Sequence, residues 1–193
     1  MKTAEIKKIR KSMEKVLDAK RYEHTLGVAY TAAALAMYYD ADIMNAEMAG
    51  LLHDCAKCIS HERKIFICGK HNISMNQIER SNPDLLHAKV GSYMAMEEYH
   101  VSDRDVINAI LNHTTGRPGM SLLEKIIFVA DYIEPNRRKA PELSKIRKMA
   151  FRDLDRALLW ILRDTLNYRK TADLIIEPMT EKTYAYYKNL IVD

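Results

Sequence analysis

Apolar residues recur at helical spacing along most of this chain, and no segment shows the apolar–polar alternation of a half-buried strand. The stretch from Arg152 to Tyr168 is an example, with Leu154, Ala157, Leu158, Ile161, Leu162, Thr165 and Leu166 at this spacing. Glycine and proline number only 6 and 5, which is few for a sandwich or barrel with many tight turns. The pattern therefore predicts an all-α fold.

Capping residues and helix breakers divide the chain into a series of expected helices. Ser121 and Glu124 form a capping box, and the run that begins at Ser102 resembles another. The segment from Thr114 to Met120 contains two glycines and a proline and is predicted to be a loop. The expected helices span residues 6–17, 24–39, 43–56, 59–70, 83–99, 102–113, 121–134 and 152–168, and a last one begins at Pro178.

Size and composition favour a single domain of ordinary globular character. The 193 residues fit one domain at roughly 100–200 residues each. The net charge of +4 is too small and too dispersed to indicate a nucleic-acid partner. No apolar run approaches the ~18 residues of a membrane span, and the stretch from Met1 to Lys20 is too charged for a signal peptide. With 3 cysteines, an odd number, a disulfide framework is not expected, so a cytoplasmic location is the prediction.

Four polar residues stand out because they lie on apolar segments. His53 and Asp54 directly follow an apolar run, His24 begins a strongly apolar helix, and Asp131 follows five apolar residues. Buried polar groups need partners, and metal coordination is one way to supply them. Imidazole and carboxylate ligands together suit Fe, Mn, Zn or Co. The alternative is that these side chains make unrelated buried hydrogen bonds.

Further residues nearby have the chemistry of phosphate binding. His87 and His113 add two imidazoles near helix ends, and His113 is followed by Thr114, Thr115, Gly116 and Arg117. Hydroxyls, a glycine and an arginine in one loop can hold phosphate oxygens. Lys57 lies four residues after His53, on the same face if the helix continues, and its charge would stabilise a phosphoryl transition state. Read individually, the loop can equally be an ordinary turn and Lys57 a surface lysine.

These residues, in this order, resemble the HD-domain metal-dependent phosphohydrolases. The matching stretches are residues 21–29, 50–57, 86–88, 113–117 and 121–135, so the resemblance covers the chain from Arg21 to about Arg137. Its long motifs are most similar to the YqeK-type subgroup, the bacterial symmetrical bis(5′-nucleosyl)-tetraphosphatases. The resemblance implies an all-α, single-domain HD fold over residues 1–193, with the metal-binding core at about 21–137 and C-terminal helices at about 141–193.

The resemblance also implies an activity and a division of roles. The reaction would be hydrolysis of diadenosine tetraphosphate to two ADP, with iron as the expected metal and Mn, Co or Zn as alternatives, in one or two ions. His24, His53, Asp54 and Asp131 would be metal ligands, and His87 and His113 would hold a second metal or contact phosphate. Asp54, Lys57 and Asp131 would be catalytic. The nucleotide contacts would be Arg21, Lys57, Thr114, Arg117, Arg137, Thr171 and Ile176.

Two other functions are compatible with the same residues. The first is an HD-domain nucleotidase that acts on mononucleotides, because loops around a shared metal centre select the substrate. The second is a non-catalytic nucleotide- or RNA-binding regulator, which the complete His/Asp set disfavours. The expected partners are a dinucleoside polyphosphate or ADP or GDP, no membrane is expected, and a homodimer is one arrangement open to the chain.

Overall fold

The computed structural model describes residues 2–192, which fold into α-helices without β-strands, as the helical spacing predicted. Eleven α-helices and one 3-10 helix lie within this range. They are α1 (Lys2–Val16), α2 (Ala19–Tyr38), α3 (Ile43–Leu52), α4 (His61–Lys70), α5 (Gln77–Ser81), η1 (Pro83–Leu86), α6 (His87–Glu97), α7 (Arg104–Asn112), α8 (Leu122–Ile133), α9 (Leu143–Ala150), α10 (Leu154–Thr171) and α11 (Pro178–Val192).

Most helices begin at a side chain that accepts a hydrogen bond from a first-turn amide, which is the capping chemistry expected of Ser, Asn and Asp. The Ser121–Glu124 capping box is present at the start of α8. The second expected capping box is wrong: Asp103 caps α7 by accepting from the amides of Asp105 and Val106. Asp103 is extended and sits one residue before the helix, so it takes the position that the pattern had given to Ser102.

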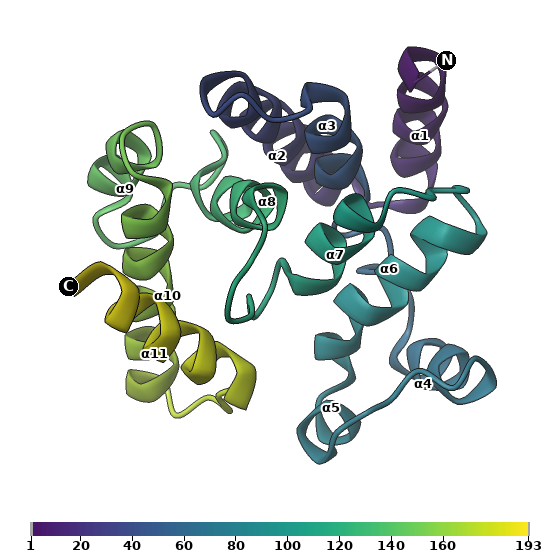
Figure 1. Ribbon diagram of the computed structural model, residues 1–193. Coiled ribbons are helices and arrows are strands. Elements are labelled where there is room, and N and C mark those ends of the chain that lie inside the picture. Colours follow the sequence, from purple (N-terminus) through teal and green to yellow (C-terminus); the bar gives the residue numbers. More distant parts are fainter. Residues whose placement is uncertain (1, 193) are drawn as a thin grey trace.

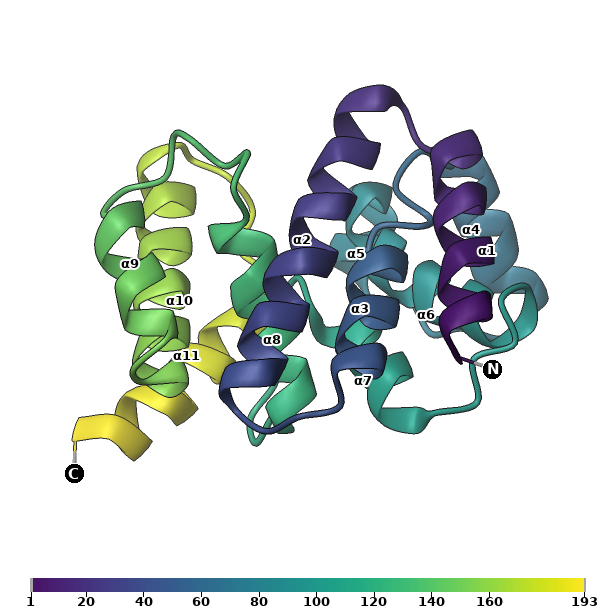
Figure 2. The same cartoon turned by 90° about the horizontal axis from the view of Figure 1, so that it is seen from above.

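The helices form two groups joined by α8 (Figure 1). α2 packs along α3 and α8, and α7 packs against α3, α6 and α8. On the other side of α8, α10 packs against α8, α9 and α11. Seen from above, α8 lies between the α2–α3 pair and the α9–α11 group (Figure 2). α8 therefore packs against helices of both groups.

Small residues bring α2 and α3 close together. Ala29 and Ala32 of α2 and Ala46 and Ala49 of α3 are fully buried. At Gly50 a Cβ atom would lie 2.6 Å from the Cα of Ala29, so only glycine permits this approach of the two backbones. α2 carries His24, one predicted metal ligand, and α3 leads into His53 and Asp54, two others. The contact between the helices therefore sets the distance from His24 to His53 and Asp54.

Several boundaries differ from the expected ones, and one of them affects the site. α3 ends at Leu52 and the chain then turns, whereas a helix to residue 56 was expected. The expected helix over 83–99 is divided into η1 and α6, so that His87 begins a helix. α5 and α9 were not individually predicted. None of the helices in the described residues is long and apolar enough to cross a bilayer.

Candidate metal centre and phosphate cleft

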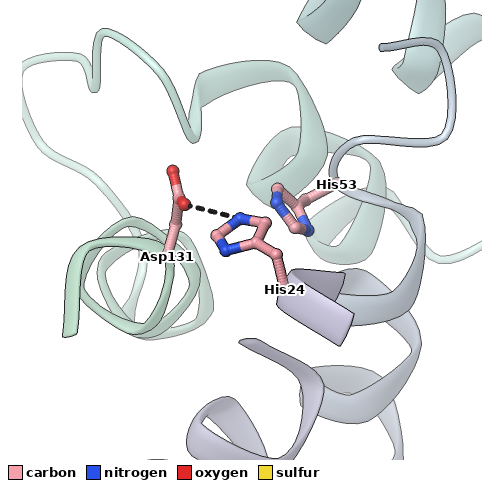
Figure 3. Close-up of side chains that lie close together, drawn as sticks. All are labelled: His24, His53 and Asp131. Atoms are coloured by element: carbon pink, nitrogen blue, oxygen red, sulfur yellow. Dashed lines mark ion pairs between the residues drawn. The ribbon is translucent and has the colours of Figure 1, made fainter. Parts of the chain in front are cut away.

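The four residues singled out as metal ligands come from three elements and meet at one place. His24 is on α2, His53 and Asp54 lie in the turn after α3, and Asp131 is on α8. The Nε2 atom of His24 is 3.1 Å from Oδ1 of Asp131, and Figure 3 shows His24 between Asp131 and His53. One potential ligand atom from each of these three residues lies within 4.8 Å of the other two. The geometry is that of a cluster and not of separate hydrogen bonds.

His53 provides the clearest sign that this cluster fits a cation. Its Nδ1 donates to the carbonyl of Gly50 at 2.7 Å, which leaves Nε2 as the unprotonated nitrogen. That Nε2 is buried and has no hydrogen-bond partner among the described residues. Burial lowers the pKa of His53 to about 4, so the ring is neutral near pH 7. A buried lone pair that faces carboxylates is the donor that a transition metal requires.

Asp54 lies at the junction of the imidazoles. Its Oδ2 accepts from Arg21 at 3.0 Å, and its Oδ1 is 3.4 Å from Nε2 of His87 and 3.7 Å from Nε2 of His113. Burial raises the pKa of Asp54, but the imidazoles of His53, His113 and His87 more than offset this and hold it well below its ordinary value. The carboxylate is thus ionised and able to bridge two groups of ligands.

The contact between Asp131 and His24 shifts the pKa values of the two groups in opposite directions. Desolvation opposes charge on Asp131, but the hydrogen bond with His24 and the other imidazoles lower the pKa of its carboxyl below the ordinary value. Desolvation also lowers the pKa of His24, while its hydrogen bonds with Asp131 and Glu134 raise the net value. The carboxylate of Asp131 is therefore ionised, and the ring of His24 lies between the carboxylates of Asp131 and Glu134.

His87 and His113 form the second part of the cluster. Their Nε2 atoms are 3.2 Å apart, and the hydroxyl of Thr114 is 3.2 Å from each. The Nδ1 of His113 donates to the carbonyl of Ile110 at 2.7 Å, and that of His87 to the carbonyl of Asp84. Both Nε2 lone pairs therefore face the same point beside Asp54. A second cation, or a proton donor on the substrate, would fit between them.

His53, His87 and His113 share one anchoring arrangement. In each, Nδ1 donates to the backbone carbonyl three residues earlier, in the last turn of a helix. The carbonyls of Gly50 and Ile110 are among the last of α3 and α7, where helix carbonyls lack an intrahelical partner, whereas that of Asp84 also accepts from the amide of His87. His24 is the exception, because its Nδ1 lies 3.2 Å from the carboxylate of Glu134, which directly follows α8 and is 110 positions further along the chain. Glu134 was not predicted, although a second carboxylate three residues after Asp131 on an apolar helix was visible in the sequence.

Every member of the cluster except the buried His53 lines a cleft of about 990 Å³. Of the predicted nucleotide contacts, Arg21, Lys57, Thr114 and Arg137 line it. Lys57 reaches the site from a turn and not from a continued helix, and its Nζ is 3.3 Å from Nδ1 of His87. Basic side chains outnumber acidic ones along the walls, since Lys20, Arg138, Lys139 and Arg169, which were not predicted, lie there as well. The cleft is suited to a polyanion.

Three predicted nucleotide contacts do not reach this cleft within the described residues. Arg117 donates from Nε and Nη2 to the buried carboxylate of Glu124, at 2.7 and 2.6 Å. The hydroxyl of Thr171 donates to the carbonyls of Asn167 and Tyr168 at the end of α10, and Ile176 lies in the following loop. From the same region α10 presents Thr165 and Arg169 to the cleft. Which side chains of α10 and of the following loop face the cleft could not be predicted from the sequence.

Comparison with known proteins agrees with this site. The HD domain model matches residues 21–136, the part of the chain that contains every proposed metal ligand. The chain is 42% identical to the symmetrical bis(5′-nucleosyl)-tetraphosphatase of Bacillus subtilis and 45% identical to that of Halalkalibacterium halodurans, over 85% of this chain and 87% of each relative.

A solved structure shares the whole architecture. It is the crystal structure of a predicted HD superfamily hydrolase involved in NAD metabolism from Clostridium acetobutylicum. That structure has a TM-score of 0.91 and 40% identity, over 95% of this chain and 97% of that one. The fold, the His/Asp cluster and the matched residues lead to one assignment: this chain belongs to the HD-domain family, and within it to the bacterial symmetrical bis(5′-nucleosyl)-tetraphosphatases.

Proposed function

We propose that this protein is a metal-dependent hydrolase that cleaves diadenosine tetraphosphate symmetrically into two molecules of ADP. The observation that carries the proposal is the buried, unpartnered Nε2 of His53, which lies beside His24 and Asp131 where these two residues line a cleft with basic walls. That nitrogen fits a cation, and the walls fit the phosphates that such a cation would activate. The similarity to the symmetrical bis(5′-nucleosyl)-tetraphosphatases of Bacillus subtilis and Halalkalibacterium halodurans supports the same substrate.

His24, His53, Asp54 and Asp131 would hold the metal. Two imidazoles and two carboxylates are a donor set for a borderline transition metal, and iron is the ion we expect. When bound, a cation of this kind acts as a Lewis acid and lowers the pKa of water towards ~7. Asp54 and Asp131, both ionised, would orient the attacking water by accepting its hydrogen bonds.

Arg21, Lys57 and Arg137 would bind the phosphates and stabilise the leaving group. Arg21 already holds Asp54, and Arg137 donates from Nη2 to Asp131 at 3.3 Å, so each guanidinium has donors left for substrate. The Nε of Arg137 is buried without a hydrogen-bond partner in residues 2–192. Lys57 lies beside His87 and Asp54, where a cation would offset the charge that develops on a departing diphosphate. Burial lowers the pKa of Lys57.

Symmetrical cleavage breaks the bond between the two inner phosphates. Water adds to one inner phosphorus, and the bridging oxygen leaves with the other half, so that both products are ADP. In water enriched in heavy oxygen, one of the two ADP molecules should carry a single label. ATP with AMP would mean attack at an outer phosphate and would overturn the symmetrical assignment. Orthophosphate from mononucleotides would instead support the nucleotidase function, and binding without turnover would support the regulator.

The same assay tests the metal ligands. His53→Ala should lose both metal and turnover while remaining folded, because the ring contributes a ligand and one local hydrogen bond. His71→Ala is a matched control, since His71 stacks on Tyr93 outside the cleft. Full activity and metal content in His53→Ala would remove the basis of the proposal.

Three further expectations belong to this proposal. Iron should be the metal found in anaerobically purified protein, with one ion or two according to whether His87 and His113 hold a second. A homodimer is tested by the mass of the protein in solution. The cytoplasm is the location in which we expect the protein to act.

A further inference from the structure

Arg147 lies on α9, outside the lining of the cleft, yet it binds the chain segment that carries three residues of the cleft. Its Nε donates to the carbonyl of Ile133 at 2.8 Å. Its Nη2 donates to the carbonyls of Glu134 and Arg137, at 2.6 and 3.0 Å. One guanidinium thus satisfies three backbone acceptors at and beyond the end of α8, where helix carbonyls lack partners.

These three contacts define a tight turn. The amide of Arg137 donates to the carbonyl of Glu134 at 3.1 Å, and Pro135 occupies the second position, where its fixed φ suits a turn. The first and last residues of the turn point side chains at the metal centre: Glu134 at His24 and Arg137 at Asp131. The backbone of the turn therefore determines where both side chains lie.

Glu134 is tightly confined within this turn. It is only 2% exposed, and one carboxylate oxygen accepts from the amide of Asn136 at 2.6 Å. The carboxylate also packs against Gly27 of α2, where a Cβ atom would collide with it. The other oxygen faces Nδ1 of His24 at 3.2 Å. No rotation of Glu134 could compensate for a displaced turn, because Gly27 and Asn136 limit the space on either side.

We propose that Arg147 is a positioning residue for the metal centre: by fixing the turn from Glu134 to Arg137 it holds Glu134 against His24. His24 needs this support because Nδ1 of its ring faces a distant side chain, whereas Nδ1 of His53, His87 and His113 donates to a backbone carbonyl three residues earlier. Partners that orient a ligating histidine typically change metal affinity by ~10–100-fold when removed. The inference rests on the proposed function only in taking His24 as a metal ligand.

The planar guanidinium is essential to this role. Arg147 donates from two different nitrogens to carbonyls on two sides of the turn, a fork that a lysine ammonium cannot reproduce. Arg147 is also half-buried and not fully enclosed, so a small guanidinium compound can enter the space left by its removal. These properties separate the proposed role from a general contribution of positive charge.

The experiment is Mn²⁺ titration of metal-free protein, with Arg147→Ala, Arg147→Lys and Glu134→Gln. We expect ~10–100-fold weaker Mn²⁺ binding in Arg147→Ala, little recovery in Arg147→Lys, and recovery on adding methylguanidinium but not methylammonium. Arg156→Ala is the matched control, because Arg156 is an exposed arginine of the neighbouring α10 that pairs with nearby Asp153, and this variant should bind Mn²⁺ as the wild type does.

A double-mutant cycle makes the test decisive even if Arg147→Ala is unstable. If Arg147 acts through Glu134, then Arg147→Lys should weaken Mn²⁺ binding far less in a Glu134→Gln background than in the wild type. Additive effects, or wild-type Mn²⁺ affinity in both Arg147 variants, would overturn the inference. Failure to cleave diadenosine tetraphosphate would refute the proposed function and leave this binding measurement unaffected.

Discussion

Replacing Gly50 by alanine should disturb the contact that sets the spacing of the metal ligands. The new Cβ would lie 2.6 Å from the Cα and 3.0 Å from the backbone nitrogen of Ala29. Non-bonded carbon atoms prefer about 3.5–4.0 Å. Both crowded atoms of Ala29 are backbone, so no side-chain rotation can relieve the overlap. α2 and α3 must therefore move apart by roughly 1 Å at this point.

The size of the effect follows from two opposing contributions. Overpacking a close-packed core costs about 1–3 kcal/mol, and a backbone-to-backbone clash belongs at the upper end. Alanine in place of a helical glycine regains about 1 kcal/mol. A net loss of about 2 kcal/mol in the free energy of unfolding is the expectation. For a chain of this length, that corresponds to a fall of roughly 4–8 °C in Tm.

The same substitution should weaken metal binding, because Gly50 lies on the helix that leads into His53, and Ala29 lies on the helix that carries His24. The carbonyl of Gly50 also accepts the Nδ1 hydrogen of His53. A shift of the two helices separates the ligands and tilts one ring. We expect Mn²⁺ affinity to fall about tenfold or more, which is the scale seen when a ligand loses its support.

Urea unfolding of the metal-free protein and Mn²⁺ titration measure the two effects separately. Gly69→Ala is the control, since Gly69 lies in α4 with nothing within 4 Å of the added Cβ. That variant should gain about 0.5–1 kcal/mol and bind Mn²⁺ normally. The reasoning fails if Gly50→Ala unfolds at the wild-type urea concentration and binds Mn²⁺ with wild-type affinity.

Three other predictions follow from individual side chains. Lys57→Ala should lower kcat and leave metal content unchanged in metal analysis, and a parallel loss of metal would contradict its role at phosphate. Arg117→Ala should destabilise the fold by about 1–3 kcal/mol in urea unfolding, because it leaves the buried Glu124 without its cation, and a rise in KM alone would place Arg117 at the substrate instead. Burial lowers the pKa of His87 to about 3. At neutral pH the ring is therefore uncharged in both the native and the unfolded protein. Between pH ~6.5 and 3, only the unfolded protein takes up a proton at this ring. The free energy of unfolding of the metal-free protein should therefore fall from pH 6.5 towards 3. In His87→Gln the change of this free energy with pH should be smaller, by up to ~1.4 kcal/mol per pH unit. Equal changes with pH in the two proteins would refute a neutral His87.

The metal cluster was predictable because each of its members is a polar residue within an apolar segment. His24, His53, Asp54 and Asp131 all have this local property, and the structure brings them together. The all-α fold was predictable for a related reason, since helical spacing is also a property of neighbouring residues. The local pattern of the sequence therefore predicts most of the helices, although not α5 and α9, and the polar residues of the cluster.

The direction of loops and of long polar side chains was not predictable in this way. Arg117 has the same residue type and a similar loop setting as Arg137, yet one pairs with Glu124 and the other reaches Asp131. The difference lies in which helix packs beside each loop, a tertiary property. Thr171 is similar, because the side of α10 that faces the cleft depends on how α10 packs against α8.

The two ways of anchoring the site histidines imply an order of assembly. His53, His87 and His113 are each oriented by a carbonyl three residues away, so their rings can take their final tautomer and direction as soon as three short helix ends have formed. Contacts this local form early, before distant parts of a chain meet. His24 acquires its direction only when Glu134, 110 positions later, arrives with α8. A cation site with an oriented His24 therefore requires the docking of α8, and a nascent chain that ends before residue 134 lacks the carboxylate that orients this ring.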